Sequence, residues 1–125
     1  MKRLIILSFA FAALTACNNG GTKDAKGDET KDDITSNPDY QKGIDLIAKS
    51  DCLTCHRVDE ELTGPPYRRV AEKYAGTSDT VVNYLAHKII TGGTGVWGNV
   101  PMLPHPTISE EDAKTIARYI LLLKK

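Results

Sequence analysis

Residues 52–56 read Cys52-Leu53-Thr54-Cys55-His56, the most informative stretch of the chain. Two cysteines separated by two residues and followed at once by a histidine are typical of covalent haem attachment. Cysteines three positions apart on a helical turn face the same side, so both thiols can bond to one edge of the macrocycle. The imidazole of the next residue can then bind the iron. We therefore predict that Cys52 and Cys55 hold a haem and that His56 is its first axial ligand.

Three other interpretations of this pentapeptide explain less of the sequence. A zinc site would need a second pair of ligands at a fixed spacing, and the chain has no second Cys-x-x-Cys pattern. A thioredoxin-like redox pair would lie near a β-α-β pattern, whereas no convincing strand alternation is visible. A structural disulfide between Cys52 and Cys55 would leave the adjacent His56 unexplained.

Length and composition favour one small domain. The chain has 125 residues, with 16 basic and 16 acidic side chains, so its net charge is zero. A balanced charge of this kind gives no indication of nucleic-acid binding. Only 6% of the residues are aromatic, and a core this small is marginally stable unaided. A buried haem would supply the missing apolar centre, and we expect a monomer.

The N-terminus has the features of an export signal. Met1-Lys2-Arg3 is basic, and residues 4–14 are apolar but shorter than the roughly 20 residues that cross a bilayer. The following Leu14-Thr15-Ala16-Cys17 resembles the lipobox of bacterial lipoproteins. That resemblance implies cleavage of residues 1–16 and a lipid anchor on Cys17. The alternative is an ordinary signal peptide, with Cys17 as a spare thiol.

Residues 17–37 are predicted to form a disordered tether. They are rich in Asn, Gly, Lys, Asp, Glu and Thr, and Ile34 is their only large aliphatic residue. Such a segment cannot bury enough apolar surface to offset its conformational entropy. With the lipid on Cys17, the tether would hold a domain of residues 38–125 on the periplasmic side of a membrane, outside the cytoplasm.

The remaining residues predict an all-α domain. Asn37-Pro38 is a favourable helix start, and Ser109 followed by acidic residues is another. The spacing of apolar residues, with glycines at the helix ends, predicts helices over about 38–49 and 67–74. A third helix is predicted to be capped by Ser78 and to end at Gly92, and a fourth to follow Ser109. Thr91 to Pro106 is rich in Gly and Pro and is predicted to be loop.

Met102 is the preferred sixth ligand of the iron. After removal of the signal it is the only methionine, and the other candidates are His87 and His105. Methionine in a core usually fills gaps on a regular element, whereas Met102 follows Pro101 in an irregular, proline-braced loop. A thioether opposite histidine raises the reduction potential, and we expect this pairing of His56 with Met102.

The chain resembles the small bacterial monohaem class I cytochromes c over residues 38–125. Cys52–His56 is similar to the haem attachment site, Gly64-Pro65-Pro66-Tyr67 to the proline loop, and Gly95-Val96-Trp97-Gly98 with Pro101-Met102 to the methionine loop. The resemblance implies a class I cytochrome c fold, with four to five short helices around one haem c.

The resemblance also implies roles for single residues. The carbonyl of Pro65 would accept a hydrogen bond from the axial histidine, which fixes its tautomer. Trp97 would donate its indole N–H to a haem propionate, although plain core packing is the alternative for this residue. Lys88 would pair with a propionate.

Two further positions of the family pattern concern packing. Gly43 and Tyr119 match the crossing of the first and last helices, where glycine lets the aromatic ring approach. The sequence departs from the pattern at His105-Pro106, where a small polar residue often steadies the methionine sulfur. We expect His105 to be exposed.

These features predict a one-electron carrier that cycles Fe(III)/Fe(II) between a donor and a terminal reductase or oxidase, and not an enzyme. A haem peroxidase or gas-sensing domain is the alternative, and each would need an open sixth position. The carrier would dock through an uncharged ring around the exposed haem edge. Its predicted members are Leu53, Thr54, Val100, Pro101, Leu103 and Pro104.

Overall fold

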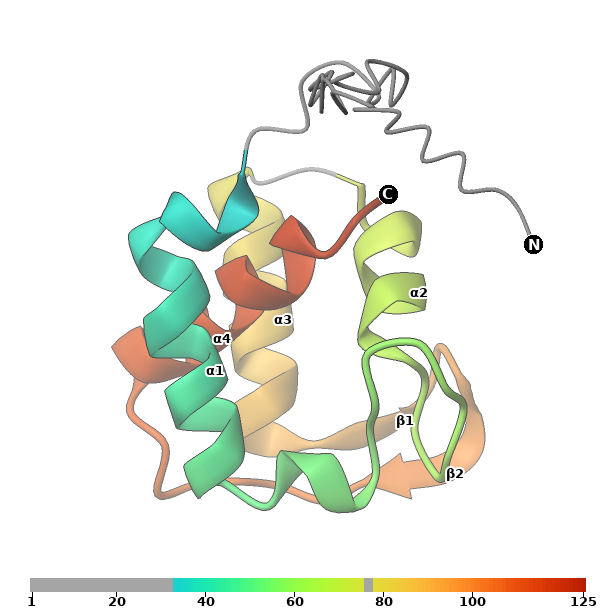
Figure 1. Cartoon of the computed structure of the whole chain (residues 1–125). Coiled ribbons are helices and arrows are strands. Elements are labelled where there is room, and N and C mark those ends of the chain that lie inside the picture. The colour runs from blue at the N-terminus through green and yellow to red at the C-terminus, as the bar shows by residue number, and fades with distance from the viewer. Residues whose placement is uncertain (1–32, 76–77) are drawn as a thin grey trace, which may run out of the picture. The chain divides into compact units, whose positions relative to one another are not determined.

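The computed structural model describes residues 33–75 and 78–125. The sequence predictions for the signal peptide (1–16), for lipidated Cys17 and for the tether as far as residue 32 lie outside the described residues. The elements seen in Figure 1 are four α-helices and two short strands, with two 3-10 turns, η1 and η2, that the figure does not label. The helices are α1 (Pro38–Lys49), α2 (Tyr67–Lys73), α3 (Asp79–Thr91) and α4 (Glu110–Leu122).

Helix α1 begins and ends where the sequence predicts. The side chain of Asn37 accepts a hydrogen bond from the backbone N–H of Asp39 at 2.9 Å, and Pro38 occupies the first helical position, where no N–H is needed. One face of the helix carries the buried Gly43 and Ile47. Regular structure is also present before Pro38.

Residues Ile34–Ser36 form the 3-10 turn η1, within the segment predicted to be a disordered tether. The Asp33 carboxylate caps this turn, because it accepts from the backbone N–H of Thr35 at 3.1 Å and from its hydroxyl at 2.6 Å. The turn also contacts α1. These local Asp-x-Thr hydrogen bonds therefore give the residues just before Pro38 a defined structure.

Helix α4 is the centre of the core and packs against α1, α2 and α3. Its start matches the prediction, since the Ser109 hydroxyl accepts from the N–H of Asp112 at 3.1 Å. At the crossing with α1, a Cβ on Gly43 would lie 2.8 Å from Cγ of Tyr119, so only glycine fits there. The predicted contact of Gly43 with Tyr119 is confirmed.

The remaining helices differ slightly from the sequence prediction. Helix α2 ends at Lys73, one residue short of the predicted bound. Ser78 precedes α3 as predicted, but its side chain makes no capping hydrogen bond. The helices enclose a core that includes Val70, Val82 and Ile116.

The predicted loop from Thr91 to Pro106 contains a small antiparallel hairpin. Strand β1 (Gly93–Gly95) pairs with β2 (Gly98–Met102), and Gly93 lies opposite Met102. The prediction of irregular structure here was wrong. The two strands lack the alternation of apolar and polar residues by which a strand is recognised in a sequence. Gly95 and Gly98, with positive φ values of 108° and 110°, are the paired strand ends on either side of the two-residue connection.

Among the described residues, no helix is both long enough and apolar enough to span a membrane.

Candidate functional site

The Cys-x-x-Cys-His segment follows α1 almost directly. Residues Cys52–Thr54 form the 3-10 turn η2, entered through Asp51, whose left-handed φ of 54° ends the helix direction. The N–H of His56 donates to the carbonyl of Cys52 at 3.0 Å, which closes the turn. Side chains three positions apart eclipse on a 3-10 turn, so a turn of this kind favours Cys52 and Cys55, the residue that ends it, on one side.

Both cysteines of the turn are free thiols and are half-buried. Cys52 packs against the hydrophobic core, and its Sγ donates to the carbonyl of Ser50 at 3.4 Å. Burial raises the pKa of the Cys52 thiol above its usual value, although a hydrogen bond with the Tyr67 side chain works in the opposite direction. Among the described residues, no three His, Cys, Asp or Glu side chains gather as a zinc site would require.

The imidazole of His56 is oriented by the loop that follows it. Its Nδ1 lies 2.8 Å from the carbonyl oxygen of Pro65. Because a carbonyl can only accept, Nδ1 carries the proton and Nε2 keeps a lone pair for a metal ion. Gly64 lies against the Nδ1–Cε1–Nε2 side of the ring, where a Cβ would come within 2.8 Å of Nδ1. The ring of Tyr67 stacks on the imidazole.

Three backbone hydrogen bonds tie the proline loop and the start of α2 to Cys55 and to the two residues that follow His56. The N–H of Gly64 donates to Cys55 at 2.8 Å, that of Tyr67 to Arg57 at 2.9 Å, and that of Arg68 to Val58 at 3.1 Å. The rigid Pro65-Pro66 pair then leads straight into α2. The position of the Pro65 carbonyl is thus set by backbone pairing.

Met102 ends strand β2 and is half-buried against the core. Gly92, at the end of α3, has a φ of 66° and lies against the chain around Met102. A Cβ on Gly92 would overlap the Met102 carbonyl and lie 2.9 Å from the nitrogen of Pro104. Only glycine allows the chain to return so close to itself. In Figure 1 the hairpin and the turn after α1 both lie at the lower end of the molecule, opposite the C-terminus.

His105 is not exposed, contrary to the sequence prediction. Its N–H donates to the carbonyls of Ile89 at 3.2 Å and Ile90 at 3.1 Å, which fastens the methionine loop to the end of α3. Its side chain is half-buried, and its Nδ1 is the only buried side-chain polar atom of residues 33–75 and 78–125 without a hydrogen-bond partner. The backbone bonds to α3 draw this residue inward, which its proline-flanked sequence does not indicate.

The sequence matches the family model described as Cytochrome c over residues 40–124. The chain belongs to the cytochrome c family. It is 44% identical over 84 residues to cytochrome c-552 of Nitrosomonas europaea, across 67% of this chain and 81% of that protein. It is 42% identical to cytochrome c-551 of Azotobacter vinelandii, across 67% of this chain and 100% of that protein. The crystal structure of wild-type Nitrosomonas europaea cytochrome c552 matches with a TM-score of 0.60 and 44% identity, over 65% of this chain and 99% of that one.

This cytochrome therefore has the class I fold that the sequence predicts, and it is an electron-transfer protein with one covalently attached haem c. The residues of the site fit that group. Two free thiols lie on one turn, an imidazole next to them has Nε2 available, and Gly64 leaves room for that imidazole. No other part of residues 33–75 and 78–125 combines these features.

Trp97 lies at the tip of the hairpin of this cytochrome, half-buried against the core. Two cations from α2 lie over its indole: the guanidinium carbon of Arg69 is 5.4 Å and Nζ of Lys73 is 5.3 Å from the ring centroid. Sequence reasoning missed both cations, although their spacing of four positions on a helix is a detectable signal. Lys88, on α3, reaches toward the hairpin, since a Cβ on Gly93 would lie 3.2 Å from its Nζ.

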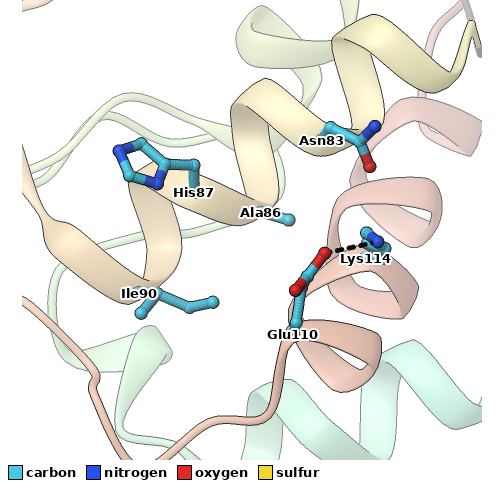
Figure 2. A pocket seen from close by; sticks show the side chains of 6 residues that line it. All are labelled: Asn83, Ala86, His87, Ile90, Glu110 and Lys114. Atoms are coloured by element: carbon cyan, nitrogen blue, oxygen red, sulfur yellow. Dashed lines mark ion pairs between the residues drawn. The ribbon is translucent and has the colours of Figure 1, made fainter.

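His87 lies apart from this arrangement. It lines a hollow of about 390 Å³ between α3 and α4 whose other residues include Glu110 and Lys114. Figure 2 shows that Glu110 pairs with Lys114, at 2.6 Å, while the His87 ring points away from them. None of the predicted haem-binding residues lines this hollow.

Proposed function

We propose that Cys52 and Cys55 form the two thioether bonds of this cytochrome and that His56 and Met102 are its axial ligands. The observation that carries the proposal is the 2.8 Å contact between Nδ1 of His56 and the carbonyl of Pro65. It leaves Nε2 as the free ligand atom of an imidazole next to two free thiols. When bound, haem c supplies a one-electron Fe(III)/Fe(II) couple.

Met102 is the proposed sixth ligand because it belongs to a braced loop. The hairpin pairing with Gly93 and the bonds of His105 to α3 hold the chain on both sides of Met102. A ligand on a braced loop needs little reorganisation when the iron changes its oxidation state. A thioether also favours the ferrous form and gives a higher potential than a second histidine would.

Trp97 and Lys88 are proposed to hold the haem propionates, through the indole N–H and the ammonium group. The cations Arg69 and Lys73 over the indole support this assignment, because they make the surroundings of Trp97 favourable for an anion. Pro65 is proposed to act only through its backbone carbonyl, as the acceptor that orients His56.

With both axial positions filled by protein, the iron would have no site for a substrate, so we propose a carrier and not an enzyme. Its docking face is the predicted uncharged ring, and all six members are exposed in the structure, Val100 by 62% and Leu103 by 69%. One correction applies to the charge of this face. Arg57 bonds to the Leu53 carbonyl, so a cation borders the ring.

The cellular setting is proposed from the sequence alone. A lipid on Cys17 would anchor the cytochrome on the periplasmic side, and the segment between Cys17 and Asp33 would let it move between a donor and a terminal reductase or oxidase. The domain would act as a monomer and bind no nucleic acid. Incorporation of labelled fatty acid that is lost in Cys17→Ser would test the anchor, and an unlabelled wild-type protein would overturn it.

The ligands are tested by optical spectra of the purified protein with and without carbon monoxide. We expect c-type bands, a sulfur-to-iron charge-transfer band in the oxidised form and no response of the reduced form to carbon monoxide. Met102→Ala should abolish the charge-transfer band and allow carbon monoxide to bind. Carbon monoxide binding by the wild type would mean an open iron, as in a peroxidase or gas sensor.

The docking face is tested by adding one charge to it. Pro104→Glu should slow electron exchange with a partner, because a carboxylate must then be desolvated in the interface. Gln41→Glu adds the same charge on exposed α1 and serves as the control. Equal rates for the two variants would remove the uncharged ring from the docking model.

A further inference from the structure

Tyr67 makes a contact that the proposed function does not use. It is the first residue of α2, and only 4% of its surface is exposed. Its ring centroid lies 5.2 Å from that of His56, and the two ring planes differ by 17°. These values describe an offset stack of nearly parallel rings, an arrangement that aromatic pairs favour.

The tyrosine ring is itself held firmly. Its backbone N–H donates to the carbonyl of Arg57 at 2.9 Å, and its side chain belongs to the hydrophobic core. A side chain packed in this way cannot rotate without leaving a void or clashing with its neighbours, so its ring is a rigid surface for the His56 imidazole.

The imidazole of His56 needs such a surface. The hydrogen bond from Nδ1 to the Pro65 carbonyl fixes the direction of one atom. It does not fix the tilt of the ring about that direction, because acceptor geometry at a carbonyl is broad. A contact on the face of the ring does restrict the tilt, and Tyr67 provides it.

We propose that Tyr67 is a positioning residue that sets the plane of the His56 imidazole relative to the haem. This inference rests on the proposed role of His56 as axial ligand. Groups that orient a ligand contribute to the tuning of a haem, beside the ligand itself. The plane of an axial imidazole decides which iron orbital it overlaps, and so how unpaired spin is distributed over the four quadrants of an oxidised haem.

Variants separate this role from plain core packing. Tyr67→Phe keeps the ring and removes the hydroxyl, whereas Tyr67→Leu keeps an apolar side chain and removes the flat face. Tyr119→Leu is the matched control. Tyr119 is also a buried tyrosine, 5% exposed, but its ring partner is Tyr40 at 5.4 Å, in an edge-on arrangement.

The readout is the proton NMR spectrum of the oxidised holoprotein, in which the haem methyl shifts report the spin distribution. We expect the order and spread of these shifts to be unchanged in Tyr67→Phe and Tyr119→Leu and altered in Tyr67→Leu. The reduction potential should likewise be unchanged in Tyr67→Phe and Tyr119→Leu and altered in Tyr67→Leu. A folded Tyr67→Leu holoprotein with the wild-type methyl pattern would overturn the proposal.

A measurement on the wild type covers the case in which Tyr67→Leu does not fold. A crystal structure of the oxidised holoprotein gives the plane of the bound imidazole directly, and we expect it to be close to parallel to the Tyr67 ring. A steep angle between them would overturn the proposal. Failure of the proposed function is distinguishable, because His56 protons without paramagnetic shifts would mean that His56 does not bind the iron at all.

Discussion

The Nδ1 atom of His56 lies 2.8 Å from the carbonyl oxygen of Pro65, on a loop whose preceding residue is Gly64. The contact depends on a backbone atom, so no side chain at position 65 can be deleted to remove it. It depends equally on Gly64, because a Cβ there would come within 2.8 Å of Nδ1 and 2.9 Å of Nε2. Gly64 is therefore the position at which the orientation of the imidazole can be tested by mutation.

We predict that Gly64→Ala displaces the His56 ring or lengthens its bond to Pro65. The added methyl group overpacks a closed site, which costs about 1–3 kcal/mol of unfolding free energy. The reduction potential should change as well, because a weaker hydrogen bond from Nδ1 makes the imidazole a less basic ligand. Chemical denaturation and voltammetry measure the two effects. Thr63→Ala, on the exposed neighbour, is the control, and equal behaviour of the two variants would contradict the role given to Gly64.

Gly43→Ala should also destabilise the protein, although alanine favours helices over glycine by about 1 kcal/mol. The new Cβ would lie 2.8 Å from Cγ of Tyr119, so α1 and α4 must move apart. Overpacking of about 1–3 kcal/mol then outweighs the gain in helix propensity. Gln41→Ala, exposed on the same helix, should change the free energy of unfolding by at most about 0.5 kcal/mol. A stabilised Gly43→Ala variant would mean that the crossing is loose.

The sequence predicts those features of the structure that depend on residues close together in the chain. Asn37 and Ser109 cap their helices with hydrogen bonds to residues two and three positions away, so the starts of α1 and α4 are visible in short windows. The haem motif is equally local. The inward position of His105 is not local, because it follows from backbone bonds to Ile89 and Ile90. The stack of Tyr67 on His56 likewise depends on how the proline loop folds back.

The β1–β2 hairpin shows a different limit. Its strands consist largely of glycine and exposed residues, so apolar periodicity cannot reveal them. The pairing of Gly93 with Met102 depends on the positive φ values of the hairpin glycines, which a sequence rich in glycine permits but does not specify.

The two cations over Trp97 should contribute separately to stability. Arg69 and Lys73 lie at 5.4 Å and 5.3 Å from the indole centroid, and an exposed cation–π contact is worth about 0.5–1 kcal/mol. We predict losses of this size in Lys73→Gln by urea denaturation. Arg69→Gln also breaks the ion pair with Glu61 at 3.1 Å, an exposed contact worth at most about 1 kcal/mol.

A double-mutant cycle isolates the contact with the ring. If Lys73 acts on Trp97, Lys73→Gln should cost little in a Trp97→Leu background, and the coupling energy should be close to the single loss. A coupling energy near zero would show that Lys73 stabilises the fold by some other means.

The last prediction concerns alkaline pH and the pair formed by Tyr74, just after α2, and Tyr84, on α3. Tyr74 and Tyr84 have ring centroids 5.7 Å apart, and burial together with a hydrogen bond to Tyr84 raises the pKa of Tyr74 to about 12. An unfolded tyrosine has a pKa of about 10. Between these two values the folded protein keeps the phenol proton that the unfolded chain loses. The stabilisation is therefore complete below about pH 10 and is lost as the pH rises toward about 12.

Tyr74→Phe has no such proton, so its unfolding free energy should fall less steeply than that of the wild type between pH 10 and about 12. Far-UV circular dichroism during urea unfolding at a series of pH values measures both slopes. Comparison of the two proteins cancels the titration of other groups, including Tyr119, whose pKa is also raised by burial. Tyr84→Phe keeps the ring and removes the hydroxyl, so it should bring the pKa of Tyr74 closer to the ordinary value. Parallel pH profiles for wild type and Tyr74→Phe would show that the phenol proton of Tyr74 does not stabilise the fold.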